Sequence, residues 1–236
     1  MLRKTYWMSD KEYQNVACEI GSLTHLARKW KNHAYVHEFL IEWETVFAYQ
    51  TFALEGEAAN ESNFMLALRY TQGLKGRLAS DEVKSIHELL MYGEPVLVGE
   101  FRQTPAFAGY HEFAPASVIP RLVTAALNRF YSKESHDPIL NAVRLFIDVI
   151  NIHPFEDGNG RLCRLLLSHA LVESGMSLFP VLLSSFHRRG RRHYIQAVKK
   201  FDEKPSLFYT MVCQSLVKVW ENFEESHGDE KLAAPS

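Results

Sequence analysis

The segment His153-Pro-Phe-Glu-Asp-Gly-Asn-Gly-Arg-Leu-Cys-Arg164 places a histidine, two acidic residues, two glycines and two arginines around one predicted turn. The proline after His153 disfavours helical backbone at the residue before it, so the preceding helix must end near this histidine. Gly158 and Gly160 permit a tight turn, and a helical pattern resumes over residues 160–174. The segment therefore predicts two helices joined by a turn on which polar side chains gather.

The turn and the helix after it have the composition of a phosphate-binding site. Gly158 and Gly160 bracket Asn159, and such a loop can curl so that successive backbone N–H groups point inward. The N-terminus of the following helix adds partial positive charge. Arg161 and Arg164 lie three residues apart and share a face of that helix, where their guanidinium groups can grip phosphate oxygens. We expect these five residues to bind phosphate groups.

Two further side chains in the segment suit the chemistry of phosphate transfer. Asp157 is a hard oxygen ligand for a Mg²⁺ ion that bridges phosphates. A neutral imidazole at His153 can take a proton from an incoming hydroxyl. Taken singly, a Gly-Asn-Gly turn, a histidine after a helix and an arginine pair are more often structural. Their ordered coincidence within twelve residues favours a functional site.

The rest of the chain has mainly helical periodicity, and strand-like alternation is scarce. Residues 93–116 differ, because prolines, glycines and short alternating stretches predict an extended loop or a small β-hairpin. Asp137-Pro138 is a clear helix start, and Ser80 is expected to cap another helix. The fold class is all-α with one small β element, with helices expected over residues 10–28, 36–54, 61–74, 80–91, 117–131, 138–153, 160–174, 194–201 and 206–223.

No internal repeat or convincing linker divides the 236 residues, so we expect one compact unit. Its parts are an N-terminal helical region over residues 1–79, a core over residues 80–223 and a polar tail over residues 224–236 that is expected to be frayed and flexible.

Composition limits the class of protein. The formal net charge is only −2, which argues against broad binding to nucleic acid or to an anionic membrane. Three widely spaced cysteines indicate free thiols in a reducing compartment. No stretch approaches the roughly 20 apolar residues of a membrane span, so a cytoplasmic location is expected.

The run His153-x-Phe-x-Asp-Gly-Asn-Gly-Arg-x-x-Arg164 resembles the signature of Fic domain proteins at every specified position, and the resemblance covers roughly Ser80 to Trp220. It implies an all-α core with a β-hairpin flap, transfer of AMP from ATP with Mg²⁺, His153 as general base, and a Tyr, Thr or Ser hydroxyl as acceptor. The related Doc-type kinases have Lys where this chain has Gly160, so the resemblance favours nucleotidyl transfer.

The run Thr51-Phe-Ala-Leu-Glu55-Gly56 resembles the inhibitory motif of the same family, in the class whose inhibitory helix lies N-terminal to the active site. It implies a brake in which Glu55 pairs with Arg164 and competes with the γ-phosphate of ATP.

The resemblance also implies two binding surfaces. The likeness places a flap at residues 99–116, where an extended segment of a target protein would pair with the hairpin edge. It places Tyr194 near the nucleotide base. The sequence leaves open whether the chain forms a homo-oligomer.

Other functions fit the same residues. A related enzyme would use another nucleotide donor or catalyse de-AMPylation. A different class of protein would sense a nucleotide and signal through a partner, although a pure binder has no use for a base at His153. The target protein, its acceptor residue and the signal that relieves the brake are not encoded in these patterns.

Overall fold

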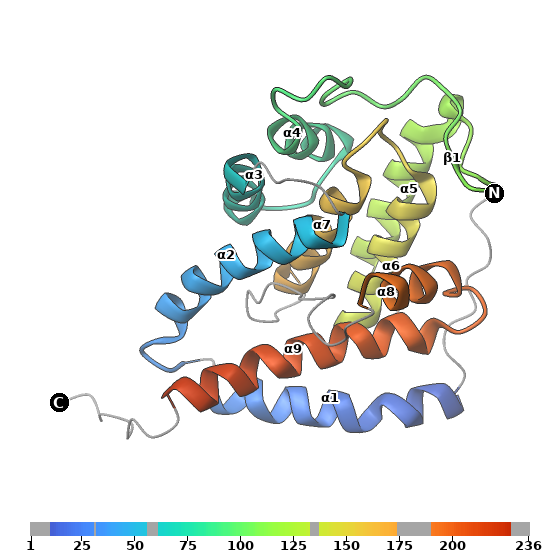
Figure 1. The fold of residues 1–236 in the computed structure, drawn as a ribbon. Coiled ribbons are helices and arrows are strands. Elements are labelled where there is room, and N and C mark those ends of the chain that lie inside the picture. The colour runs from blue at the N-terminus through green and yellow to red at the C-terminus, as the bar shows by residue number, and fades with distance from the viewer. Residues whose placement is uncertain (1–9, 31, 56–60, 133–136, 174–189, 228–236) are drawn as a thin grey trace. The chain divides into compact units, whose positions relative to one another are not determined.

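The computed structural model describes residues 10–30, 32–55, 61–132, 137–173 and 190–227 (Figure 1). Within these ranges the chain forms α-helices, one short 3-10 helix and one two-stranded antiparallel hairpin, which confirms the predicted fold class. Contacts divide the chain into one unit built around residues 51–176 and a second unit built from residues 3–50 and 177–236. The boundaries expected from the sequence, at residues 79/80 and 223/224, stay predictions.

The first unit is centred on two helices whose side chains are almost all buried. These are α6 (Pro138–Ile152) and α7 (Asn159–Glu173), which pack along each other. They are flanked by α3 (Glu61–Gly73), α4 (Ser80–Leu90) and α5 (Ile119–Ser132). The last turn of α2 (Val36–Glu55) also belongs to this unit. The turn between α6 and α7 is thus attached to the most deeply buried part of the unit.

Both ends of α6 are set by local sequence, as predicted. The carboxylate of Asp137 accepts hydrogen bonds from the backbone N–H groups of Ile139 (2.9 Å) and Leu140 (3.2 Å), and Pro138 occupies the first turn. At the other end His153 takes a left-handed conformation with φ 52° and ψ 62°, while its N–H still bonds the carbonyl of Val149 at 3.0 Å. The histidine is therefore the C-cap of the helix and the first residue of the turn.

The hairpin predicted between residues 93 and 116 is present. Strand β1 (Phe107–Ala108) pairs antiparallel with β2 (His111–Glu112), and Gly109 supplies the positive φ of 65° that the two-residue turn requires. The pairing continues past the strands, because the N–H of Phe113 donates to the carbonyl of Ala106 at 3.0 Å. A short 3-10 helix (Ala116–Val118) then leads into α5.

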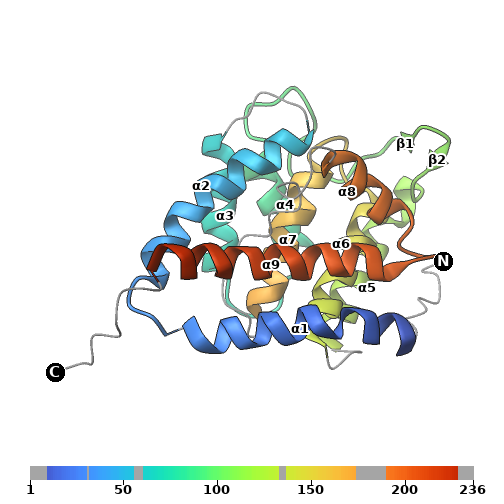
Figure 2. The same cartoon turned by 60° about the horizontal axis from the view of Figure 1, so that its bottom comes forward.

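In the second unit, α1 (Asp10–Trp30) runs beside α9 (Pro205–His227) in the same direction, and α8 (Gly190–Lys199) packs on α9 (Figures 1 and 2). Helix α9 continues past Phe223 to His227, whose ring stacks on Phe223 at 4.7 Å. Helix α8 begins before the residue 194 expected from the sequence and takes in part of the basic stretch at residues 188–192.

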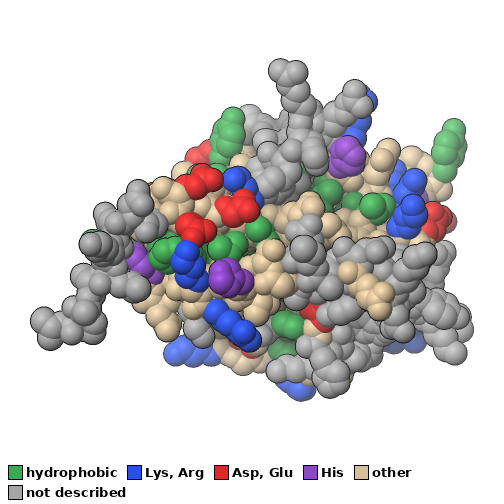
Figure 3. All heavy atoms as spheres, turned by 90° about the horizontal axis from the view of Figure 1, so that it is seen from below, with side chains coloured by type: hydrophobic (Ala, Val, Ile, Leu, Met, Phe, Trp, Pro, Cys, Tyr) green, Lys and Arg blue, Asp and Glu red, His purple; other side chains and the backbone are tan. Residues whose placement is uncertain are grey.

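Charged side chains of both signs lie next to one another on the face drawn in Figure 3. Lys29 pairs with Glu224, and Lys218 pairs with Glu221 at 3.5 Å. These pairs are solvent-exposed and contribute little to stability. Of the helices that the structure describes, none combines the length and the apolar character needed to cross a bilayer.

We predict that Asp137→Ala lowers the free energy of unfolding by about 1 kcal/mol, because two N–H groups at the start of α6 lose their acceptor. Asp137→Asn keeps an oxygen acceptor and serves as the matched control. Denaturant unfolding followed by circular dichroism measures both. Equal midpoints for Asp137→Ala and the wild type would show that the cap does not stabilise the helix.

Candidate active site

The His153 side chain is half-buried and held by the hairpin. Its imidazole stacks face to face on the ring of Phe113, with centroids 3.9 Å apart and planes inclined by 10°. Phe113 directly follows β2, so a hairpin residue covers one face of the proposed base. The stack limits rotation of the imidazole and leaves its edge to carry the ring nitrogens.

The turn after His153 is braced by the Asn159 side chain. Its Oδ1 accepts from the N–H of Phe155 at 3.0 Å, and its Nδ2 donates to the Phe155 carbonyl at 2.8 Å. The N–H of Gly158 donates to its neighbour Asp157 Oδ1 at 2.7 Å. The Asn159 amide group is therefore used to hold the loop, so phosphate binding at this residue would fall to its backbone N–H.

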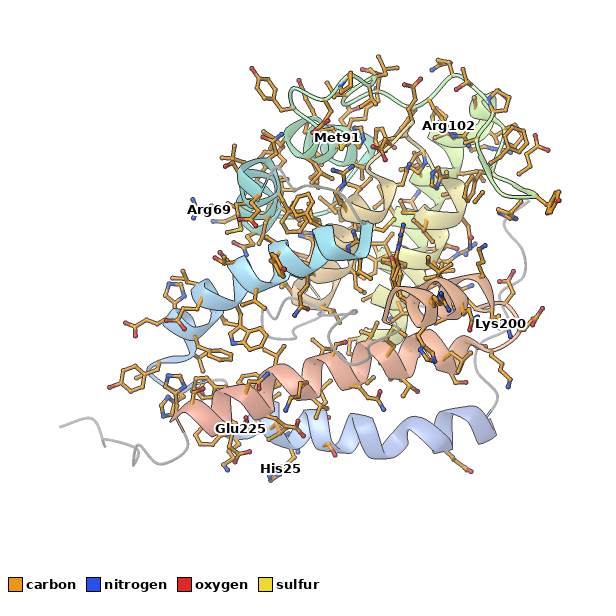
Figure 4. All side chains as sticks on the ribbon, in the orientation of Figure 1. His25, Arg69, Met91, Arg102, Lys200 and Glu225 are labelled. Carbon is orange, nitrogen blue, oxygen red and sulfur yellow. The ribbon has the colours of Figure 1, made fainter. Side chains whose placement is uncertain are left out.

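Gly158 cannot be replaced without moving its neighbours. Its φ of +74° is rarely adopted by other residues, and a Cβ there would lie 2.7 Å from the sulfur of Met91 and 3.2 Å from Nε2 of His87. Figure 4 labels Met91, which is the C-cap residue of α4. The end of α4 thus supports the underside of the turn.

His87 is a residue of the site that the sequence analysis missed. It is fully buried on α4, and its ring stacks on Phe155 at 3.7 Å and 5°. The N–H of Gly99 donates to His87 Nδ1 at 3.0 Å, so Nε2 must carry the hydrogen that it donates to the Asp157 carbonyl, also at 3.0 Å. One neutral imidazole therefore joins the start of the flap segment to the turn. A lone histidine on a helix gives no local signal of this role.

Burial lowers the pKa of His87 from 6.5 to about 4, opposed in part by the hydrogen bond to the Asp157 carbonyl, while the positive charge of Arg161 makes a smaller contribution in the lowering direction. The ring is therefore neutral under physiological conditions, as its two hydrogen bonds require.

Arg161 and Arg164 both contact the last turns of α2. The guanidinium carbon of Arg161 lies 6.0 Å from the centre of the Phe52 ring, and its Nη2 lies 3.3 Å from Asp157 Oδ2. Arg164 is 1% exposed and donates from Nη2 to the carbonyl of Thr51 at 3.2 Å. In this state α2 covers the side chain that is predicted to bind the terminal phosphate.

Three predicted residues are not placed at the site. The side chain of Glu55 and the whole of Gly56 lie outside the described residues. Tyr194 belongs to the second unit, where it is buried and its ring lies 6.1 Å from that of Phe208. Its role near the base stays a prediction.

The donor groups fit a magnesium ion that is held mainly by substrate. Among the described residues, no three His, Cys, Asp or Glu side chains cluster as a metal cage would require. Asp157 stands at the rim of the turn with its side chain 53% exposed. Mg²⁺ is commonly bound by one or two carboxylates together with phosphate oxygens and water, so one exposed carboxylate beside a phosphate site is sufficient.

We predict that His87→Gln reduces the loss of stability in acid. Between pH 6.5 and pH 4 the unfolded chain binds a proton at His87 that the folded chain excludes, so this stabilisation is complete above pH 6.5 and disappears as the pH falls towards 4. The histidine term amounts to about 3 kcal/mol, and glutamine keeps a donor and an acceptor without titrating. Denaturant unfolding across that pH range should show a shallower slope for the variant, and parallel curves would refute this assignment.

Comparison with known proteins shows which family this chain is similar to. Residues 77–171 match the model of the Fic/DOC family. The protein adenylyltransferase Fic of Culex quinquefasciatus is 28% identical over 218 residues, which cover 83% of this chain and 43% of the relative. The chain thus spans less than half the length of the curated relatives it matches.

Solved structures share the fold at lower identity. A Fic family protein from Desulfovibrio desulfuricans G20 has a TM-score of 0.74 at 18% identity, covering 94% of this chain and 77% of that one. A Fic protein from C. elegans has a TM-score of 0.73 at 20% identity, covering 92% and 74%. Residues 77–171 are therefore similar to a Fic/DOC domain, and the chain shares the fold of Fic family proteins.

Proposed function

We propose that this protein is a protein adenylyltransferase that moves AMP from ATP to a Ser, Thr or Tyr hydroxyl of a target protein. The observation that carries the proposal is the turn between α6 and α7, which has an oriented imidazole at its start and two buried arginines on the helix at its end. Curated relatives named protein adenylyltransferase support the reaction class.

In the proposed reaction the hydroxyl oxygen of the target attacks the α-phosphorus of ATP. His153 takes the hydroxyl proton, an O–P bond forms, and the bond from the α-phosphorus to the bridging oxygen breaks to release pyrophosphate. Such a displacement is accelerated mainly by positioning and by fixed charge. The Phe113 stack supplies the positioning of the base, because it restricts the imidazole to one plane.

The phosphates are proposed to sit on the N-terminus of α7. Asn159 and Gly160 bring backbone N–H groups to this end of the helix, where the first donors lack partners within the helix. The N–H of Gly158, which donates to Asp157 Oδ1 in this structure, would exchange that acceptor for a phosphate oxygen. Arg161 and Arg164 would balance the charge of the phosphates. Asp157 would hold Mg²⁺, which supplies further charge neutralisation when it is bound.

We propose that the target docks on the flap at residues 99–116. The hairpin strands are mostly exposed, with Phe107 and Tyr110 among the most exposed large apolar side chains of the described residues. A two-stranded hairpin has free edges that can accept an extended peptide through main-chain hydrogen bonds. A cytoplasmic location and self-association stay predictions.

The last turns of α2 are proposed to act as a brake. They already contact both arginines, through Phe52 and through the carbonyl of Thr51. Glu55 lies one helical turn further along, at the end of α2, where its carboxylate would pair with Arg164 in place of the γ-phosphate of ATP. Gly56 would then end the helix. Residues Thr51, Glu55 and Gly56 are therefore assigned to regulation.

We predict that His153→Ala abolishes AMP transfer and leaves ATP binding nearly intact, because only the proton acceptor is lost. Incubation with α-labelled ATP and Mg²⁺ measures the label on protein, and equilibrium binding measures the nucleotide. His25→Ala changes an exposed histidine of α1 and is the control. Undiminished labelling in His153→Ala would refute the mechanism, and wild-type protein that retains nucleotide without labelling any protein would favour nucleotide sensing.

We predict that Glu55→Gly raises adenylylation, self-modification included, by about tenfold to a hundredfold, since one charge-assisted pair is worth roughly 1.5–3 kcal/mol. The control is Glu42→Gly, which removes an exposed carboxylate from the interior of the same helix, where glycine weakens the helix more than it does at the terminal position 55. Initial rates at matched ATP and Mg²⁺ give the comparison. Equal rates for Glu55→Gly and wild type would rule out the brake.

A further inference from the structure

Arg102 lies in the segment between α4 and the hairpin and is 1% exposed (Figure 4). Its side chain makes four hydrogen bonds, and every acceptor is a backbone carbonyl. Within the described part of the chain, the guanidinium forms no ion pair with a carboxylate. The acceptors are the carbonyls of Ile152 (3.3 Å), His153 (2.6 Å), Thr104 (2.6 Å) and Ala114 (2.5 Å).

These acceptors belong to two separate segments of the chain. Thr104 and Ala114 lie just before and just after the hairpin, so two N–H groups fasten both of its arms. Ile152 and His153 are the last residue and the C-cap of α6. The backbone N–H of Arg102 also donates to the carbonyl of Pro154 at 2.9 Å. One residue thus ties the hairpin to the start of the turn.

The position of the charge is favourable despite its burial. The C-terminus of a helix carries partial negative charge on carbonyls that have no partner within the helix, and a cation there satisfies both the charge and the hydrogen bonding. The planar fork of arginine spreads five N–H donors over three nitrogens and so reaches carbonyls on separate segments, whereas lysine carries three donors on a single nitrogen. Burial lowers the pKa of Arg102 but leaves it charged.

The two groups of acceptors flank the stack between Phe113 and His153. Arg102 bonds the carbonyl of His153 itself and the carbonyl of Ala114, the residue directly after Phe113. Each ring of the stack is therefore carried by backbone that the same guanidinium holds. The face-to-face geometry, with planes inclined by 10°, depends on these two backbones keeping their distance.

We propose that Arg102 is a positioning residue for the transfer reaction, which fixes the orientation of the His153 imidazole by clamping the two backbones that carry the His153–Phe113 stack. The expected effect on kcat rests on the proposed function, whereas the effect on the orientation of the imidazole does not. Arg102 does not touch the reacting atoms. It acts through His153, and it couples the docking flap to the base.

The first test separates kcat from KM in Arg102→Lys, which keeps the charge but reaches fewer carbonyls. The kcat for AMP transfer should fall about a hundredfold, as expected for a misplaced catalytic group, while the KM for ATP stays at the wild-type value. Rates are expressed per nucleotide-binding site, so that unfolded protein is not counted. Arg129→Lys is the matched control, because Arg129 is a mostly buried arginine of the same unit that bonds Asp148 Oδ2 at 3.0 Å. It should retain the wild-type kcat.

The second test reads the imidazole without any activity. The ring-proton signals of His153, assigned by their loss in His153→Ala, should be displaced in the NMR spectrum by the ring current of the stacked Phe113. Arg102→Lys should move these signals, and Arg129→Lys should leave them in place. Unchanged His153 signals in folded Arg102→Lys overturn the inference. If Arg102→Lys moves the His153 signals but the wild-type protein transfers no AMP, the proposed function is refuted and the positioning role of Arg102 stands.

A third variant covers the case in which Arg102→Lys does not fold. Phe113→Leu removes the stack and keeps the buried cation and its acceptors. It must shift the His153 signals and lower kcat with the KM for ATP unchanged. If Phe113→Leu keeps the wild-type kcat, the stack does not affect the reaction, and the proposed positioning role of Arg102 is refuted.

Discussion

His153 ends α6 in a left-handed conformation, with φ 52° and ψ 62°, that residues other than glycine seldom adopt. Such backbone costs roughly 1–2 kcal/mol and persists only where neighbouring groups determine it. Here the Arg102 guanidinium bonds the His153 carbonyl, and the hairpin covers the imidazole. The whole site follows from this turn, because it points the base out of α6 and starts the loop that leads into α7.

The turn is supported from two further directions. The buried ring of His87 holds the Asp157 carbonyl from the side of α4, and the Asn159 side chain closes the loop on itself. From the side of α2, Thr51 and Phe52 contact the two arginines. The base and the loop are thus fixed by groups that the proposed brake leaves untouched, whereas α2 covers the arginines. This separation lets a brake block the nucleotide without dismantling the catalytic geometry.

The helix ends and the turn that depend on local sequence patterns were predicted from the sequence. Asp137-Pro138 starts α6, the proline after His153 ends it, and Gly158, with a φ of 74°, makes the turn, whereas Gly160 already lies in α7. Long-range contacts could not be predicted, since His87 lies 70 residues from its partner Asp157 and Arg102 lies 51 residues from His153. The expected N-cap at Ser80 was wrong by one residue. Ser80 is the first helical residue, and Ala79, with extended backbone at φ −110° and ψ 179°, is the N-cap, whose N–H donates to the Glu82 carboxylate at 2.8 Å.

The central claim is that a triphosphate on the N-terminus of α7 presents its α-phosphorus to His153. A crystal structure of the Glu55→Gly protein with Mg²⁺ and a non-hydrolysable ATP analogue tests it most directly. We predict phosphates on the backbone of residues 158–160, the terminal phosphate on Arg164, and an imidazole edge directed at the α-phosphorus. A nucleotide bound elsewhere, or a His153 ring turned away from the phosphates, would contradict it.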